Sequence, residues 1–124
     1  MQLHLERPDY TFFLRGADGT SALVNERRLT ASFILSPNTL IEQWPVGHVA
    51  AMVPADLDAL FALQPELILL GCGAVQAFPP PATMAACLSR GIGLETMTNP
   101  AAARTFNVLA SEGRRVVSGF VLQG

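Results

Sequence analysis

The fold is decided by a short apolar stretch, which reads Glu-Leu-Ile-Leu-Leu-Gly-Cys-Gly from residue 66 to residue 73. Its apolar run is continuous and ends at Gly71, a pattern typical of a strand buried on both faces of a parallel sheet. Pro65 stops the segment before it, and a loop follows over 72–80, which ends in the first two of three consecutive prolines at 79–81. The stretch therefore predicts a buried strand of an α/β sheet.

Helical and strand patterns alternate on both sides of this strand. Helical spacing of apolar residues, an opening proline and a closing glycine mark the helices. The elements predicted in this part are a helix over 54–64, a helix over 81–90 that buries Met84, Cys87 and Leu88, a strand over 92–97, a helix over 99–112, and a strand over 115–122. Short apolar strands that alternate with helices imply right-handed parallel crossovers.

The first fifty residues favour β structure. Strand patterns over 10–15 and 21–25 flank Asp18-Gly19, a hairpin signal, and further strands are predicted over 29–36 and 39–44. We expect 1–50 to form an antiparallel β meander that packs as a layer against an αβαβαβ core, 51–124, in one domain, 1–124. The predicted fold class is α/β with three layers and a central mixed, largely parallel sheet.

Composition excludes several classes of protein. The chain has 124 residues, of which 50% are hydrophobic and 15% charged, with a net charge of −2, so intrinsic disorder and an electrostatic nucleic-acid footprint are excluded. It has no lysine, which removes Schiff-base and phosphate-loop lysine chemistry. The sequence has neither a signal-peptide pattern nor a bilayer-length apolar run. We expect a bacterial-type cytoplasmic protein with free thiols and no membrane insertion.

A candidate ligand crevice lies at the carboxyl ends of the strands that end at Gly71 and Met97. If these strands are parallel neighbours, Gly71, Cys72 and Gly73 meet Thr98 and Asn99 at one edge of the sheet, where open α/β sheets bind ligands. The start of the following helix would offer N–H groups to an anion. In the alternative interpretation, Asn99 is an ordinary helix N-cap and the glycines only turn the chain.

Two other chemistries can be placed at this crevice. Dinucleotide binding would use the glycines and Glu95, but Gln76 stands where the third glycine of that motif belongs, and the proline run delays the helix. A nucleophilic Cys72 near a helix N-terminus would have a lowered pKa. Its only possible imidazole bases are His4 and His48, which lack a recognisable partner motif. A thiol packed in a turn is the simpler interpretation.

Other site patterns are weak. The sequence has neither a nucleophile elbow nor a metalloprotease motif, and its two cysteines lack metal-ligand spacing, so we expect no catalytic residues, no metal and no cofactor. The pairs Arg27-Arg28 and Arg114-Arg115 fit a solvated surface, or contacts to an acidic partner.

The segment from Met97 to Val116 predicts an alanine-rich helix with one stripe of small residues. That stripe contains Asn107, and a mid-helix asparagine is costly unless its amide is paired, so we expect a bond to a neighbouring loop. Glu112 is expected to pair with Arg114 or Arg104 across the end of the helix.

This segment, together with 69–73 and 91–95, resembles a family of small domains of unknown function. The family includes a mitochondrial respiratory complex I assembly factor and an adipogenesis-associated protein. The chain departs from the family pattern at Cys72, which replaces a threonine, at Phe106, which replaces a tyrosine, and at Thr98-Asn99. The departures at Cys72 and at Thr98-Asn99 alter the crevice itself, and they argue against a fixed catalytic role there. The matching positions are Gly71, Gly73, Met97, Ala101, Ala102, Arg104, Thr105, Asn107, Leu109, Glu112, Arg114 and Val116.

The resemblance implies a three-layer fold with a central mixed sheet, and no established enzyme activity for bacterial members. For the mitochondrial relative it implies a chaperone-like role through protein contacts. We therefore expect a non-enzymatic protein-interaction or assembly module, with a protein partner or a second copy of itself on an exposed apolar patch. The alternative is a small-molecule or anion-binding protein, possibly an enzyme, that uses the crevice beside Gly71 and Met97.

Overall fold

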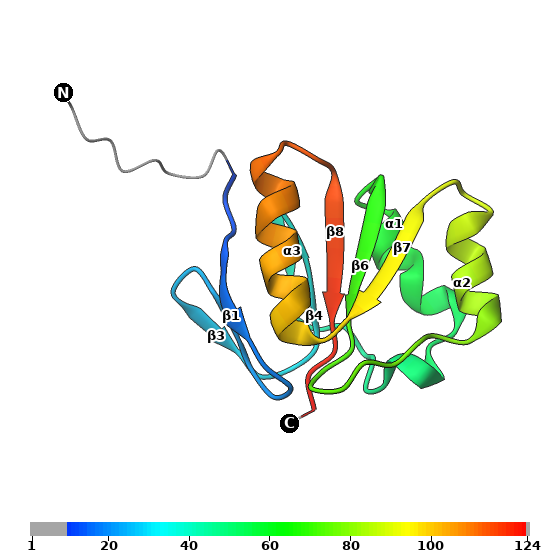
Figure 1. Ribbon diagram of the computed structural model, residues 1–124, viewed down its shortest axis with the longest axis horizontal. Coiled ribbons are helices and arrows are strands. Elements are labelled where there is room, and N and C mark those ends of the chain that lie inside the picture. The colour runs from blue at the N-terminus through cyan, green and yellow to red at the C-terminus, as the bar shows by residue number, and fades with distance from the viewer. Residues whose placement is uncertain (1–9, 124) are drawn as a thin grey trace.

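A five-stranded mixed sheet in the order β5-β4-β8-β6-β7 forms the centre of the molecule (Figure 1). The computed structural model describes residues 10–123. The strands of this sheet are β4 (Phe33–Ser36), β5 (Thr39–Ile41), β6 (Leu67–Gly71), β7 (Gly93–Met97) and β8 (Val116–Phe120). β6 runs parallel to both of its neighbours, β7 and β8, whereas β4 runs antiparallel to β8 and to β5.

The apolar stretch that opened the sequence analysis is β6, and its burial explains its composition. Ile68, Leu69 and Leu70 are fully buried, because side chains on both faces of this strand are covered. The predicted adjacency of the strands that end at Gly71 and Met97 is confirmed, since Gly71 pairs with Met97 in parallel register.

A separate antiparallel sheet contains β1 (Leu14–Ala17), β2 (Ala22–Val24) and β3 (Arg27–Leu29). The predicted three-layer α/β class is confirmed. The N-terminal strands do not all lie in one layer, however, because β4 and β5 extend the central sheet instead. The reason is that Phe33, Ile34 and Leu35 of β4 are all fully buried, so this strand needs cover on both faces.

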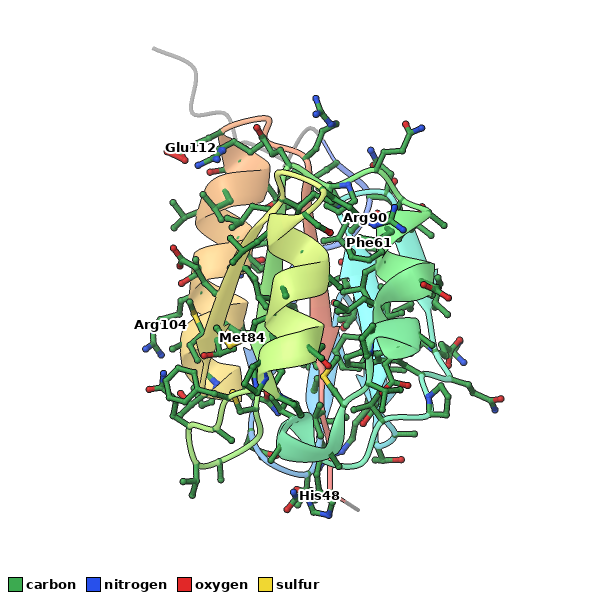
Figure 2. All side chains as sticks on the ribbon, turned by 90° about the vertical axis from the view of Figure 1, so that its right-hand side faces the viewer. His48, Phe61, Met84, Arg90, Arg104 and Glu112 are labelled. Carbon is green, nitrogen blue, oxygen red and sulfur yellow. The ribbon has the colours of Figure 1, made fainter. Side chains whose placement is uncertain are left out.

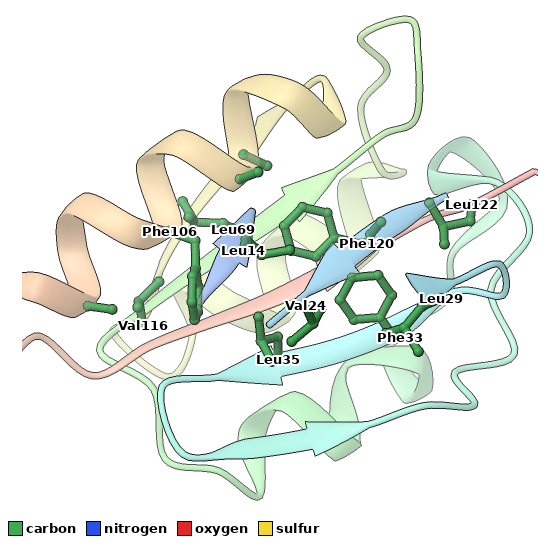
Figure 3. Close-up of a cluster of buried hydrophobic side chains, with 14 residues drawn as sticks. Leu14, Val24, Leu29, Phe33, Leu35, Leu69, Phe106, Val116, Phe120 and Leu122 are labelled. Carbon is green, nitrogen blue, oxygen red and sulfur yellow. The ribbon is translucent and has the colours of Figure 1, made fainter. Parts of the chain in front are cut away.

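Helices lie on both faces of the central sheet. They are η1 (Val49–Ala51), η2 (Pro54–Leu57), α1 (Asp58–Phe61), α2 (Pro81–Leu88) and α3 (Asn99–Ser111). α3 and the small sheet cover one face, and the apolar cluster between them (Figure 3) includes Phe33 and Phe120, whose stacked rings have centroids 5.0 Å apart. η1, η2, α1 and α2 cover the other face with a second apolar cluster.

α2 turns a different face inward from the predicted one. Thr83 and Cys87 are fully buried, and the Thr83 hydroxyl donates to the carbonyl of Met52 at 2.8 Å. Leu88, by contrast, is 75% exposed and Met84 is 37% exposed, so the prediction that both are core was wrong. The reason is that α2 is apolar around its whole circumference, and its sequence gives no sign of which side faces the sheet.

Two buried serines lie near the centre of the fold and differ in their hydrogen bonding. Ser32 donates from its hydroxyl to the carbonyl of Val46 at 2.8 Å and accepts from the N–H of Leu122 at 2.9 Å. Ser118 on β8 is fully buried, and its hydroxyl has no hydrogen-bond partner among the described residues. An unpaired buried hydroxyl costs free energy that a methyl group would not.

We expect Ser118→Ala to leave the free energy of unfolding unchanged or to raise it by up to about 1 kcal/mol, because no hydrogen bond is lost. The matched variant Ser32→Ala should lower it by about 1–3 kcal/mol, because a buried donor and a buried acceptor lose their partner. Urea unfolding followed by circular dichroism measures both. If the two variants lost the same free energy of unfolding, the difference in hydrogen bonding between Ser118 and Ser32 would be contradicted.

Candidate functional site

The carboxyl ends of β6 and β7 meet at one corner of the sheet. The N–H of Cys72 donates to the carbonyl of Met97, and the N–H of Asn99 donates to the carbonyl of Gly73, each at 2.8 Å. Gly73 has φ +99°, a conformation that favours glycine, and it turns the chain away from β6. Gly71, Cys72 and Gly73 therefore lie beside Thr98 and Asn99, as expected.

The side-chain amide of Asn99 fills this corner. It is fully buried, and its Oδ1 accepts from the N–H of Gly73 at 3.0 Å. Its Nδ2 donates to the carbonyls of Asp18 at 2.8 Å and of Val121 at 2.9 Å. A Cβ on Gly71 would collide with Asn99 Oδ1, so the glycine leaves the room that the amide occupies. The amide thus ties together the β1–β2 turn, the end of β6 and the segment after β8.

The capping residue of α3 is Thr98, and Asn99 is already inside the helix. The interpretation of Asn99 as an ordinary N-cap is therefore wrong. The structure has one cavity beside Cys72 and another beside Arg114 and Arg115. Neither cavity is lined by Gly71, Gly73, Thr98 or Asn99. Ligand binding at the corner stays a prediction, and such a ligand would have to displace the Asn99 amide.

The Cys72 thiol lies at the edge of a small cavity of about 240 Å³ that His48 and Gln123 also line. Cys72 is 7% exposed, and its thiol donates to the carbonyl of Ala77 at 3.1 Å. Burial raises the pKa of this thiol, which is the opposite of the shift that a nucleophile needs. His48 Nδ1 lies 3.0 Å from Gln123 Nε2, and His4 lies outside the described residues. The geometry therefore disfavours a thiolate at Cys72.

The geometry for dinucleotide binding is also incomplete. A pyrophosphate needs a helix that starts directly after the first strand, but α2 begins only at Pro81. Gln76 instead donates from Nε2 to the carbonyl of Thr96 at 3.2 Å, so its side chain covers part of the edge of β7. Glu95, the expected ribose-binding acid, is exposed on that strand.

Asn107 joins α3 to the small sheet. Its Oδ1 accepts from the N–H of Leu14 at 3.0 Å, and its Nδ2 donates to the carbonyl of the same residue at 2.6 Å. The expectation that this amide is paired is confirmed, although its partner is a strand and not a loop. Thr105 on the same helix is half-buried.

The charged residues of the family-like segment lie at the surface. Arg104 is exposed on α3, and Glu112 is exposed directly after the helix (Figure 2). Arg114 pairs with Glu66, with Nε 3.3 Å from Oε1, and not with Glu112 as expected. The N–H of Arg115 donates to the same carboxylate oxygen at 3.0 Å, and this bond together with Arg114 lowers the pKa of Glu66.

A second cavity, of about 740 Å³, lies at the opposite end of the sheet, near the amino ends of β6 and β8. Its walls come from segments that are far apart in the sequence: Tyr10 and Phe13, the β4–β5 turn, the end of α3, and Arg114-Arg115. Sequence reasoning missed this cavity. The signal that could have indicated it is the arginine pair, for which the sequence allows either a solvated surface or contacts to an acidic partner.

Large apolar side chains are exposed in the loop before α2 and on α2 itself. They lie within residues 75–88, and their exposed fractions are 77% for Val75, 60% for Phe78, 37% for Met84 and 75% for Leu88. Figure 2 views the molecule from the side of α2 and labels Met84. We call Val75, Phe78, Met84 and Leu88 the α2 surface.

Residues 10–123 contain neither a cluster of metal-ligating side chains nor a helix that could span a membrane. No group of three histidine, cysteine, aspartate or glutamate side chains in this range is placed to hold a metal ion. No helix in the same range has both the length and the apolar character needed to cross a bilayer.

Residues 15–121 match a family described as proteins of unknown function, DUF498/DUF598. Among solved structures, an NMR structure of a Xanthomonas campestris protein is 57% identical, with a TM-score of 0.85 over 100% of this chain and 94% of that one. Among curated proteins, the 13 kDa major membrane protein of Francisella tularensis is 31% identical over 84 residues, which are 67% of this chain and 68% of that protein.

Assembly factors are also similar to this chain. The NADH dehydrogenase [ubiquinone] 1 alpha subcomplex assembly factor 3 of Bos taurus is 31% identical over 94 residues, or 74% of this chain. The match covers 50% of that protein, so the chain spans about half the length of this assembly factor.

Proposed function

This chain belongs to the DUF498/DUF598 family of proteins of unknown function, and from that membership we propose that it is a non-enzymatic module that docks onto another protein. Complex I assembly factors among its relatives support this proposal, because an assembly factor acts through contacts with other proteins. The pKa of the Cys72 thiol, which burial raises, favours a non-enzymatic role over thiol catalysis.

The observation that carries the proposal is the α2 surface. Leu88 and Val75 are three-quarters exposed, and Phe78 and Met84 lie in the same short stretch of chain. Met84 and Leu88 are four residues apart and share one face of α2. Exposed apolar side chains that lie together mark sites of protein association, whereas isolated ones are ordinary. The docking partner would therefore present an apolar surface of its own, either on another protein or on a second copy of this chain.

The alternative of a ligand site at the Gly71–Asn99 corner has less support. The N–H of Gly73 and the carbonyls around the corner are already bonded to the Asn99 amide.

A cytoplasmic location is also part of the proposal, and the two free thiols, Cys72 and Cys87, support it.

The test places a photo-crosslinking residue at Leu88 and, in a second protein, at Val108, an apolar residue of α3 with 57% exposure. Light-induced adducts in the native host are identified by mass spectrometry, and light scattering reports self-association. We expect a discrete adduct or dimer from position 88 and none from position 108. Leu88→Glu should weaken the association by roughly tenfold or more, as expected for a central contact residue.

Val108→Glu is the matched control, because it adds the same charge at a similarly exposed apolar position. Both variants should keep the stability of the parent protein, since neither side chain is in the core. A monomer that yields no adduct from position 88, or an association that both variants weaken equally, would refute docking through the α2 surface.

A further inference from the structure

The 740 Å³ cavity at the amino ends of β6 and β8 has the size of a site for a small organic ligand. Phe13 and Val108 line it and are 40% and 57% exposed, so an apolar ligand would cover apolar surface that water now contacts. We call this space the arginine cavity, because Arg114 and Arg115 are the only charged residues within 10–123 that line it.

Both arginines are held in place by bonds from Nε. Arg114 Nε lies 3.3 Å from Glu66 Oε1, and Arg115 Nε donates to the carbonyl of Gln64 at 3.2 Å. These bonds leave the terminal N–H groups of both guanidinium groups for a ligand. The Glu66 carboxylate offsets one of the two positive charges, so the arginine cavity has about one positive charge to neutralise.

Two polar side chains of the walls, Asn38 and Tyr10, add hydrogen-bond donors. Oδ1 of Asn38 already accepts from the N–H and the hydroxyl of Thr11, each at 3.0 Å, so the amide offers a ligand its N–H groups. Burial raises the pKa of Tyr10, which keeps its phenol protonated and able to donate. The hydroxyl of Ser111 already donates its one proton to the carbonyl of Val108 at 2.7 Å, so it offers a ligand only an acceptor.

We propose that the arginine cavity binds an amphipathic monocarboxylate, with its carboxylate on the guanidinium of Arg115 and its apolar chain against Phe13 and Val108. A guanidinium matches the two oxygens of a carboxylate, and a single carboxylate neutralises the one remaining charge. An amphipathic amine would meet the same charge with repulsion. This site is separate from the α2 surface and does not depend on docking there.

The test compares octanoate, octanol and octylammonium as probes that share an apolar chain and differ in charge. Each is titrated into the 124-residue chain while the backbone amide signals are followed by NMR. We expect saturable shifts with octanoate at Ser111, Gly113 and Arg115, binding of octanol weaker by roughly tenfold or more, and no saturable shift with octylammonium. Arg115→Gln should weaken octanoate binding by a similar factor.

Arg28→Gln is the matched control, because Arg28 is an exposed arginine on β3 that does not line the cavity, and it should leave octanoate binding unchanged. Ser111→Phe, which places a ring in the cavity, should abolish binding. Leu88→Glu should have no effect, which separates this proposal from docking at the α2 surface. Equal binding of the three probes, shifts confined to another surface, or no binding at all would overturn the proposal.

Discussion

The variant Asn99→Asp is expected to lower the free energy of unfolding by about 3–5 kcal/mol, because a buried amide donor becomes an acceptor. In the parent protein, Asn99 Nδ2 donates to the carbonyls of Asp18 and Val121. A carboxylate in its place would put negative oxygen against both carbonyls in a fully buried position. Chemical denaturation followed by circular dichroism measures the loss.

Aspartate is the informative substitution because it separates two explanations of Asn99. If Asn99 acted as a helix N-cap, aspartate would replace it at almost no cost, since both residues are good caps. Asn99→Ala should also destabilise the protein strongly, because it leaves the N–H of Gly73 and two carbonyls unpaired. A stable Asn99→Asp protein would show that the Asn99 amide is not what joins the corner.

Gly119→Ala is expected to destabilise the protein by about 2–3 kcal/mol through overpacking. Gly119 lies on β8, and an added Cβ would come within 2.6 Å of two carbon atoms of the Trp44 ring. Trp44 cannot move away freely, because it is buried and its indole N–H donates to the carbonyl of Asp56 at 3.0 Å.

The measurement has a built-in probe, because Trp44 is the only tryptophan of the chain. Gly119→Ala should shift its fluorescence emission as well as lower the midpoint of urea unfolding. Gly47→Ala is the matched control, since a Cβ at Gly47 has no atom within 4 Å, and it should change neither quantity. A wild-type spectrum and midpoint for Gly119→Ala would contradict the close packing of β8 on Trp44.

The parallel half of the sheet was predictable because local patterns specify it. The apolar run of β6 ends at a glycine, and β7 and α3 follow with their own start and stop signals, so the meeting of Gly71 with Met97 followed from topology alone. The position of β4 in the central sheet was harder to predict from the sequence. Its sequence alternates enough to suggest a half-buried strand, and only Ile34 on the polar side indicates that both faces are covered.

The role of Asn99 could not be predicted from its neighbours. Thr98 and Asn99 both precede a proline, and either is a good N-cap, so the sequence does not say which one begins the helix. The partners that distinguish them, Asp18 and Val121, lie far away in the chain. The arginine cavity has the same character, because its walls meet only after the chain has folded.

The position of β8 in the sheet has a consequence for how the chain reaches this structure. β8 is the last strand of the described residues, yet it lies between β4 and β6, and within 10–123 it is the strand that pairs with both of them. Until residues 116–120 join the sheet, the edges of β4 and β6 that pair with β8 have unsatisfied backbone groups. Such edges pair readily with other chains, so we expect aggregation to compete with folding until β8 is in place.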